Sequence, residues 1–200
     1  AEQGAKCIIL CNEEAYDRVG ARYLSAATNM SMEEVRQNVT LASTRYKPIK
    51  ENIYVKDTTG KDMDWVEAAV KAMNPDIVEL DMGDKFAPRT GERSDIYLKE
   101  AAIHARNIAN RYKCAILWMS QLSAEAEGKI YVDQSMLEGS KTGKASEADL
   151  MLLISKNPTI ESQENEDTQR HLVIAKNKLK GGWHGKITVE LDGERARFTA

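Results

Sequence analysis

Asp81 is the residue whose type and position most directly suggest chemistry, because it ends the hydrophobic run 77–80. In open α/β sheets the ligand site lies beyond the carboxyl ends of the strands. A carboxylate there is placed to hold a hydrated Mg²⁺ ion beside nucleotide phosphates, although an aspartate also ends many strands without binding a metal. Glu79 shares the face of Asp81 at a spacing of two residues, and a buried carboxylate at that position needs a partner.

Two other apolar runs also end in polar side chains that suit phosphoryl transfer. The run 7–10 leads into Glu13, and the run 114–119 leads into Gln121. A glutamate carboxylate can orient an attacking water or accept its proton, and a glutamine amide can donate to and accept from a phosphate–water pair. Each residue alone could be a turn or capping residue. Together with Asp81, these strand ends predict a phosphoryl-transfer site.

The elements that must position these side chains alternate between strand and helix. Short apolar runs typical of strands in a parallel sheet lie at residues 7–10, 53–55, 77–80, 114–119, 150–154 and 172–175. Helices are predicted between them by a capping box at 31–34 and by apolar residues at helical spacing over 65–73 and 98–112. This order predicts an α/β fold with a mostly parallel, twisted sheet flanked by helices.

The end of the chain has a different pattern. Ile187, Val189 and Leu191 alternate with polar residues, and Asp192-Gly193 supplies a turn signal. We therefore expect a C-terminal antiparallel hairpin at the edge of the sheet. The sequence shows no internal repeat or flexible linker, so residues 1–200 are expected to form a single domain.

Composition excludes several classes of protein. Of the 200 residues 42% are hydrophobic, so the chain can bury a core and is neither a disordered tail nor a disulfide-stapled miniprotein. Its three cysteines fit a reducing compartment, and no apolar run approaches the roughly 18 residues that span a bilayer. We therefore expect a cytoplasmic protein with no membrane contact. Because 28 basic and 31 acidic residues give a net charge of −3, any nucleic-acid binding has to be local.

Two polar segments carry clustered cations. They hold Lys85, Arg89 and Arg93 after the third apolar run, and Lys129, Lys141 and Lys144 after the fourth. Such clusters can follow the phosphate backbone of single-stranded DNA, although most charged loops are simply solvated. Residues 139–145 are not a P-loop, because only three residues separate the two glycines and an alanine follows the lysine.

The order of these motifs resembles the helicase core of the DnaB-type replicative DNA helicases and the phage primase–helicases, a RecA-like ATPase family. The resemblance covers nearly the whole chain. The similar segments are Glu13 with Arg22 (catalytic glutamate), 77–81 (Walker B), 120–122 (Ser-Gln-Leu), 137–150 (DNA-binding loop) and 176–178 followed by glycines (Lys-Asn-Arg segment). Each motif is weak singly, and their shared order makes the resemblance fairly specific.

The resemblance implies a role for each of these residues. Glu13 would polarise the attacking water, Asp81 would hold Mg²⁺, and Gln121 would sense the γ-phosphate of ATP or another nucleoside triphosphate. Lys176 and Lys178 would act on the nucleotide of a neighbouring subunit, which implies a homo-oligomer, expected to be a hexameric ring. The other implied partners are single-stranded DNA and a primase, as a preceding domain or a separate protein.

Two features depart from the family pattern. Lys178 stands where the family has an arginine finger, and lysine lacks the planar bidentate fork, so Lys178 acts as a point charge or another residue such as Arg170 takes the role. The sequence contains no P-loop, and residues 1–6 resemble the end of the helix that follows one. We therefore expect residues 1–200 to be a fragment that begins after the Walker A strand–loop–helix and binds ATP poorly by itself.

Three hypotheses for function follow. The leading one is the motor part of a ring-forming replicative helicase that couples nucleotide hydrolysis to translocation on single-stranded DNA. The second is a non-catalytic RecA-like module that binds nucleic acid or a partner, which the missing P-loop favours. The third is another RecA-like ATPase, such as a recombinase or a clock-type ring, which the segment 176–178 and its following glycines make less attractive.

Overall fold

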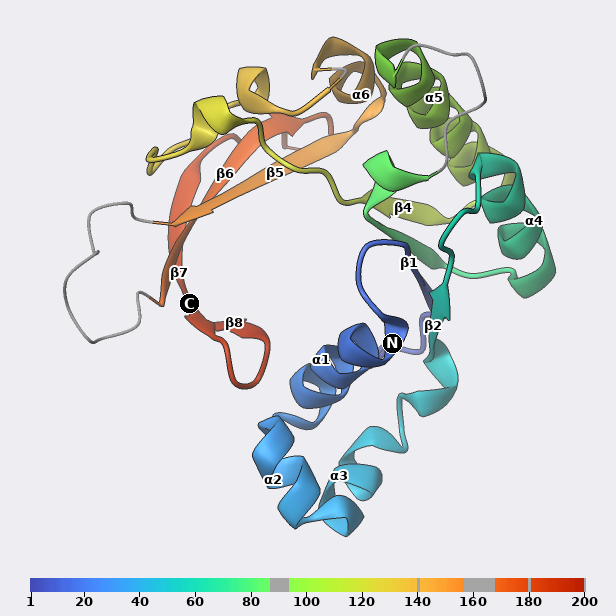
Figure 1. Cartoon of the computed structure of the whole chain (residues 1–200), viewed down its shortest axis with the longest axis vertical. Helices are drawn as coiled ribbons and strands as arrows, with labels where there is room; N and C mark the ends of the chain where they lie inside the picture. The colour runs from blue at the N-terminus through green and yellow to red at the C-terminus, as the bar shows by residue number, and fades with distance from the viewer. Residues whose placement is uncertain (87–93, 140, 157–167, 180, 200) are drawn as a thin grey trace. The chain divides into compact units, whose positions relative to one another are not determined.

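The computed structural model describes residues 1–86, 94–139, 141–156, 168–179 and 181–199 (Figure 1). It contains two compact units, and each is described by itself. The first is Ala1–Ser120 with Glu194–Ala196, and the second is Gln121–Gly193 with Arg197–Ala200. Whether residues 1–200 act as a single domain stays a prediction.

A four-stranded parallel sheet forms the centre of the first unit. Its strands are β1 (Cys7–Cys11), β2 (Ile53–Asp57), β3 (Ile77–Asp81) and β4 (Ala115–Trp118). They lie in the order β2-β1-β3-β4, and every neighbouring pair is parallel. The first four apolar runs of the sequence are thus confirmed as parallel strands, which need crossover connections between them.

Helices supply the connections. They are α1 (Tyr16–Thr28), α2 (Met32–Gln37), α3 (Val39–Tyr46), α4 (Met63–Met73) and α5 (Ser94–Tyr112), with the 3₁₀ turns η1 (Lys50–Asn52) and η2 (Gly83–Lys85). The predicted capping box at the start of α2 is confirmed, since the side chains of Ser31 and Glu34 each accept a hydrogen bond from the backbone amide of the other residue. The Asp62 carboxylate caps α4 by accepting from the amide of Trp65 at 2.9 Å.

Helices cover both faces of the parallel sheet, with α1 on one side and α4 and α5 on the other (Figure 1). Strand β1 contacts both layers because its side chains alternate between faces. Ile8 and Leu10 belong to the core formed with α4 and α5, whereas Ile9 and Cys11 pack with Val19 of α1. This two-sided burial leaves the strand ends as the place where polar side chains gather.

The second unit is built on an antiparallel sheet in the order β5-β6-β7-β8. Its strands are β5 (Leu150–Lys156), β6 (Gln169–Asn177), β7 (Lys186–Asp192) and β8 (Arg197–Thr199). The helix α6 (Lys141–Glu147) and the 3₁₀ turns η3 (Ala124–Ala126) and η4 (Gln134–Met136) precede them. The apolar core of this unit contains Val132, Met136, Leu137, Leu153 and Val173.

The interpretation of residues 150–154 and 172–175 as parallel strands is wrong, because β5 and β6 pair antiparallel. Leu153 is buried, whereas Leu152 and Ile154 are 53% and 48% exposed, so β5 has one covered face. Apolar residues occupy both faces of this strand, and the sequence therefore hides the alternation that marks a one-sided antiparallel sheet.

The predicted C-terminal hairpin is confirmed in β7 and β8, whose register places Asp192 opposite Arg197. Its predicted place at the edge of the parallel sheet is wrong, because β7 and β8 belong to the separate antiparallel sheet. The parallel sheet with its flanking helices and this antiparallel hairpin confirm the predicted α/β class. Within the described ranges, no helix combines the length and the apolar character needed to cross a membrane.

Candidate functional site

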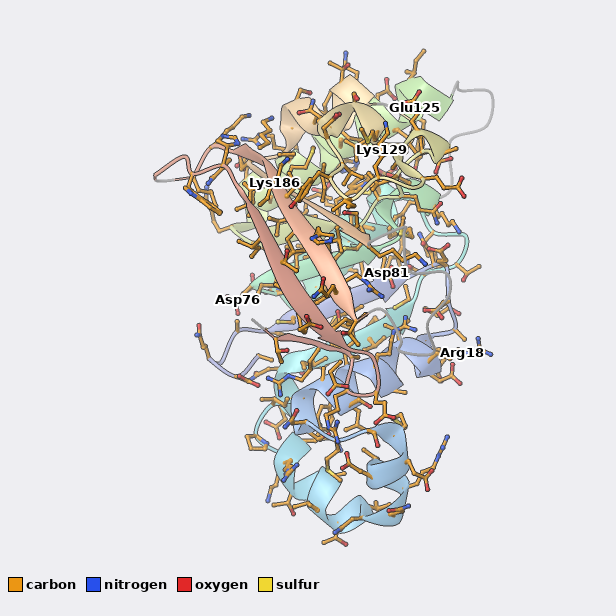
Figure 2. The ribbon with its side chains drawn as sticks, turned by 90° about the vertical axis from the view of Figure 1, so that its left-hand side faces the viewer. Arg18, Asp76, Asp81, Glu125, Lys129 and Lys186 are labelled. Atoms are coloured by element: carbon orange, nitrogen blue, oxygen red, sulfur yellow. The ribbon has the colours of Figure 1, made fainter. Side chains whose placement is uncertain are left out.

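The carboxyl ends of the parallel strands lie in register at one edge of the first sheet. Cys11 at the end of β1 pairs with Asp57 of β2 on one side and with Asp81 of β3 on the other (Figure 2 labels Asp81). The loop that carries Glu13 begins directly after Cys11. Two of the three predicted catalytic strand ends therefore meet at this edge.

Asn12 fixes the loop after β1 to the segment after β3. Its backbone amide donates to the carbonyl of Asp81 at 2.9 Å, and its side-chain Oδ1 accepts from the amide of Met82 at 2.9 Å. The buried Thr58, just beyond β2, donates its amide and its hydroxyl to the Cys11 carbonyl at 2.7 and 2.9 Å. Neither Asn12 nor Thr58 is among the predicted site residues. Each is a polar residue directly after a strand, and this sequence pattern could have identified both.

The Asp81 carboxylate lies in a partly buried and acidic environment. Burial raises the pKa of Asp81, the charge of Arg22 lowers it, and the charges of Glu13 and Glu14 raise it again. Arg22 forms an ion pair with Glu14, so its guanidinium lies among the carboxylates of this edge. A cation bound here would find oxygen donors and a favourable negative field.

Glu79 has the partner that a buried carboxylate requires. The hydroxyl of Tyr23, on α1, donates to Glu79 Oε2 at 2.5 Å. Burial raises the pKa of Glu79, the hydrogen bond from Tyr23 lowers it, and the charge of Asp81 raises it. Burial also raises the pKa of Cys11 to about 12, so this thiol stays protonated near neutral pH and is not a nucleophile.

The turn η2 connects strand ends through its side chains. Asp84 accepts hydrogen bonds from Trp118 Nε1 at 2.8 Å and from Ser120 Oγ at 2.5 Å, which fixes the end of β4. The ammonium of Lys85 lies 2.6 Å from Glu13 Oε1. Lys85, which is predicted to contact DNA, thus forms an ion pair with the predicted catalytic glutamate.

Gln121 lies in the second unit, whereas Glu13 and Asp81 lie in the first. Its side chain is exposed, and its carbonyl accepts from the amide of Glu138 at 3.1 Å. The role of Gln121 as a sensor of the γ-phosphate stays a prediction.

Lys176 and Lys178 meet at the C-terminal end of α6. The ammonium of Lys176 donates to the carbonyls of Ala145 and Ser146, and that of Lys178 donates to the Ser146 carbonyl at 3.3 Å. Carbonyls at a helix end lack helical partners, and the helix dipole favours positive charge there. The two lysines that are predicted to act on a neighbouring nucleotide therefore cap the helix of the predicted DNA-binding segment.

Replacing Lys176 with methionine is expected to destabilise α6 locally by about 1–2 kcal/mol, because the helix end loses two charge-assisted hydrogen bonds. The measurement is hydrogen exchange of the α6 amides in the full-length protein, which should become faster. Lys186→Met is the matched control, since that ammonium lies 4.0 Å over the ring of Tyr131. Equal exchange in the two variants would contradict a capping role for Lys176.

The cations that are predicted to contact DNA are placed differently from one another. Lys129 is exposed (Figure 2). Lys144 is buried, and its ammonium donates to the Glu138 carbonyl at 2.6 Å. This contact engages the ammonium of Lys144 within its own segment, and a contact of Lys144 with a DNA phosphate stays a prediction. Outside the described part lie Arg89, Arg93 and the side chain of Lys141, whose backbone begins α6.

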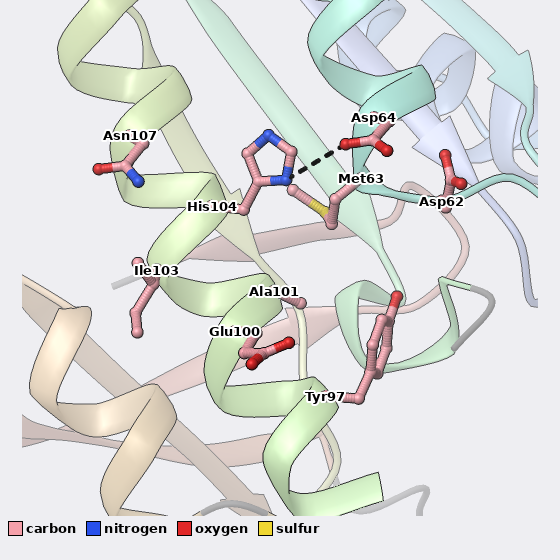
Figure 3. Close-up of a pocket in the computed structure, with 9 residues that line it drawn as sticks. All are labelled: Asp62, Met63, Asp64, Tyr97, Glu100, Ala101, Ile103, His104 and Asn107. Atoms are coloured by element: carbon pink, nitrogen blue, oxygen red, sulfur yellow. Dashed lines mark ion pairs between the residues drawn. The ribbon is translucent and has the colours of Figure 1, made fainter. Parts of the chain in front are cut away.

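A cavity of about 360 Å³ lies beside α4 and α5 and is lined by Asp64, Glu100 and His104, among others (Figure 3). His104 has its Nε2 2.8 Å from Glu67 and its Nδ1 3.8 Å from Asp64. In the part of the chain that the structure describes, no group of three or more His, Cys, Asp or Glu side chains is placed to hold a metal ion. The contacts of His104 join α5 to α4 and indicate a structural role.

Comparison with known protein families bears on this arrangement of strands and strand ends. Residues 1–127, more than half of the chain, match the family model described as the AAA domain. The chain belongs to the AAA domain family. A search of curated proteins finds no match to this AAA domain chain.

Solved structures with a similar fold include an ATPase domain and a DnaB-like helicase. One of them, an ATPase domain, matches with a TM-score of 0.82 at 16% identity, over 98% of this chain and 75% of that one. A DnaB-like replicative helicase, solved in a study of its interactions with primase, matches with a TM-score of 0.83 at 15% identity. That match covers 98% of this chain and 52% of the helicase, so the chain spans about half of its length. The predicted RecA-like core of the DnaB type is confirmed as the fold.

Proposed function

We propose that this chain is part of the motor domain of a ring-forming replicative helicase, in which nucleotide hydrolysis drives translocation on single-stranded DNA. The observation that carries the proposal is the placement of the Glu13 loop beside Asp81, at the carboxyl ends of adjacent parallel strands. Membership of the AAA domain family and the likeness to an ATPase domain and to a DnaB-like helicase support a nucleotide-dependent motor.

In this proposal the chain's own side chains position water and phosphate. The Glu13 carboxylate orients the attacking water and accepts its proton. Gln121 contacts the γ-phosphate, and Lys176 with Lys178 approach the nucleotide of a neighbouring subunit. The complete site therefore needs two protomers, and a hexameric ring supplies them. A lysine at position 178 offers a point charge where an arginine would offer two parallel hydrogen bonds.

The donor chemistry at Asp81 fits a hydrated Mg²⁺ ion. Carboxylate oxygens are the hard ligands that Mg²⁺ prefers, and it usually binds one or two of them together with waters and substrate phosphates. The charges of Glu13 and Glu14, which raise the pKa of Asp81, make this edge attractive to a cation. When bound at Asp81, the ion would neutralise charge on the phosphates of ATP or another nucleoside triphosphate.

The experiment that tests the proposal is ATP hydrolysis by the full-length protein, with and without single-stranded DNA. We expect Mg²⁺-dependent hydrolysis that DNA stimulates. DNA binding without hydrolysis would instead support a non-catalytic RecA-like module that binds nucleic acid. If the protein neither binds DNA nor hydrolyses ATP, both hypotheses are overturned. A primase, as a domain or a partner, is proposed on the likeness to a helicase solved in a study of its interactions with primase.

Replacing Lys129 and Lys141 with alanine is expected to weaken binding of single-stranded DNA and to make its salt dependence shallower. Each lost phosphate contact on a single strand reduces the steepness of the slope of log affinity against log salt by about 0.7. Loss of two contacts therefore predicts a slope that is shallower by about 1.4. Fluorescence anisotropy of a labelled oligonucleotide across a salt series measures this slope. The control replaces Lys56 and Lys71, which are exposed on β2 and α4. A slope equal to that of the control would count against the segment.

A further inference from the structure

The ion pair between Lys85 and Glu13 places a cation on the residue that is proposed to activate water. The Lys85 Nζ and Glu13 Oε1 atoms are 2.6 Å apart, and the side chains are 46% and 31% exposed. A carboxylate oxygen that accepts a hydrogen bond from an ammonium has one lone pair fewer to offer to a water molecule. The partial exposure of both side chains leaves the pair accessible to water and to ligands.

The Lys85 side chain starts from a backbone that is fixed on both sides. Asp84 before it is bound to Ser120 beyond β4. Phe86 after it is fully buried, and the Phe86 carbonyl accepts from the Tyr97 hydroxyl at 2.7 Å. The ion pair can therefore break by rotation of the Lys85 side chain while the turn stays in place.

We propose that Lys85 is a brake on hydrolysis that a phosphate of single-stranded DNA releases. Without DNA, the ammonium of Lys85 is bound to the Glu13 carboxylate. The proposed function, on which this inference rests, gives that carboxylate the role of orienting the attacking water. A DNA phosphate offers the ammonium a competing anion, and its binding leaves Glu13 able to accept the proton from water. Because coupling between two binding events is reciprocal, loss of the Glu13 charge also strengthens DNA binding.

The strength of the ion pair sets the size of the effect. Exposed ion pairs change an equilibrium constant by a factor of up to about five, and salt weakens them. The brake therefore lowers DNA-free hydrolysis severalfold and does not abolish it. A contact of this strength is also one that a single phosphate can displace.

The test replaces Lys85 with methionine in the full-length protein and measures ATP hydrolysis without DNA and at saturating single-stranded DNA. We expect the DNA-free rate to rise about three- to fivefold while the DNA-saturated rate stays the same, so that the stimulation factor falls by the same ratio. Lys85→Arg keeps the charge and is expected to keep the brake. Lys71→Met, at an exposed position of α4, is the matched control and changes neither rate.

A second measurement does not depend on hydrolysis. Glu13→Gln is expected to bind single-stranded DNA about three- to fivefold more tightly than the wild type, because Lys85 is no longer engaged. Lys85→Met combined with Glu13→Gln is expected to lose this gain. An affinity of Glu13→Gln equal to that of the wild type would overturn the proposal.

The outcomes separate the brake from the proposed function. If the wild type shows DNA-stimulated hydrolysis but the DNA-free rate of Lys85→Met is unchanged or lower, Lys85 is not a brake and the proposed function stands. If the DNA-free rate rises and the stimulation factor does not fall, DNA is not the ligand that releases Lys85. If the wild type does not hydrolyse ATP, both the proposed function and the brake are overturned.

Discussion

Replacing Glu13 with glutamine is expected to lower the rate of ATP hydrolysis by the full-length protein at least about a hundredfold, since a positioned general base contributes factors of about 100 to 10,000. Glutamine keeps the size of the side chain, but its amide cannot take a proton from water at neutral pH. Nucleotide binding is expected to be unchanged, because the proposed contact of Glu13 is with the water. Phosphate release measures the rate, and calorimetric titration with a non-hydrolysable ATP analogue measures the binding.

Glu14→Gln is the matched control for this experiment. Glu14 forms an ion pair with Arg22 in which the side chains are 39% and 50% exposed, so its removal is expected to change hydrolysis by no more than a small factor. Normal hydrolysis in Glu13→Gln would remove Glu13 from the mechanism. An equal loss in both variants would show that hydrolysis depends on the total charge of this loop rather than on one base.

The meeting of Glu13 and Asp81 could be predicted from the sequence because it follows from strand geometry. Apolar runs separated by helical segments indicate parallel strands, and parallel strands present their carboxyl ends at the same edge. The register of Cys11 with Asp81 then needs no knowledge of side-chain contacts. The same reasoning failed for β5 and β6, because a strand with apolar residues on both faces does not reveal its direction.

The partners of the charged side chains could not be predicted, because they depend on tertiary packing. Lys85 and Glu13 are 72 positions apart in the chain, and no local pattern indicates their ion pair. Lys144 lies in a polar, glycine-containing segment that predicts exposure, yet a backbone carbonyl binds its ammonium in the interior. Charge clustering in a sequence therefore identifies candidate phosphate contacts, and the structure decides which charges are already engaged.

Replacing Phe86 with alanine is expected to lower the free energy of unfolding by about 3–5 kcal/mol. Phe86 is fully buried in the core that the parallel sheet shares with α4 and α5, so its removal combines the loss of buried apolar surface with a cavity. A loss of this size is a large part of the roughly 5–15 kcal/mol that stabilises most proteins. Urea unfolding of the full-length protein measures it, at one protein concentration because assembly shifts the midpoint.

Phe198 offers a matched control, because the chain has two phenylalanines and this one is 49% exposed on β8. Phe198→Ala is expected to lower the free energy of unfolding by less than about 1 kcal/mol, as substitutions on the surface usually do. Equal midpoints for the two variants would contradict the burial of Phe86. The buried Phe86 ring also anchors the turn from which Lys85 reaches Glu13. Phe86→Ala is therefore further expected to weaken that ion pair and to raise the DNA-free rate of hydrolysis at temperatures where the variant remains folded.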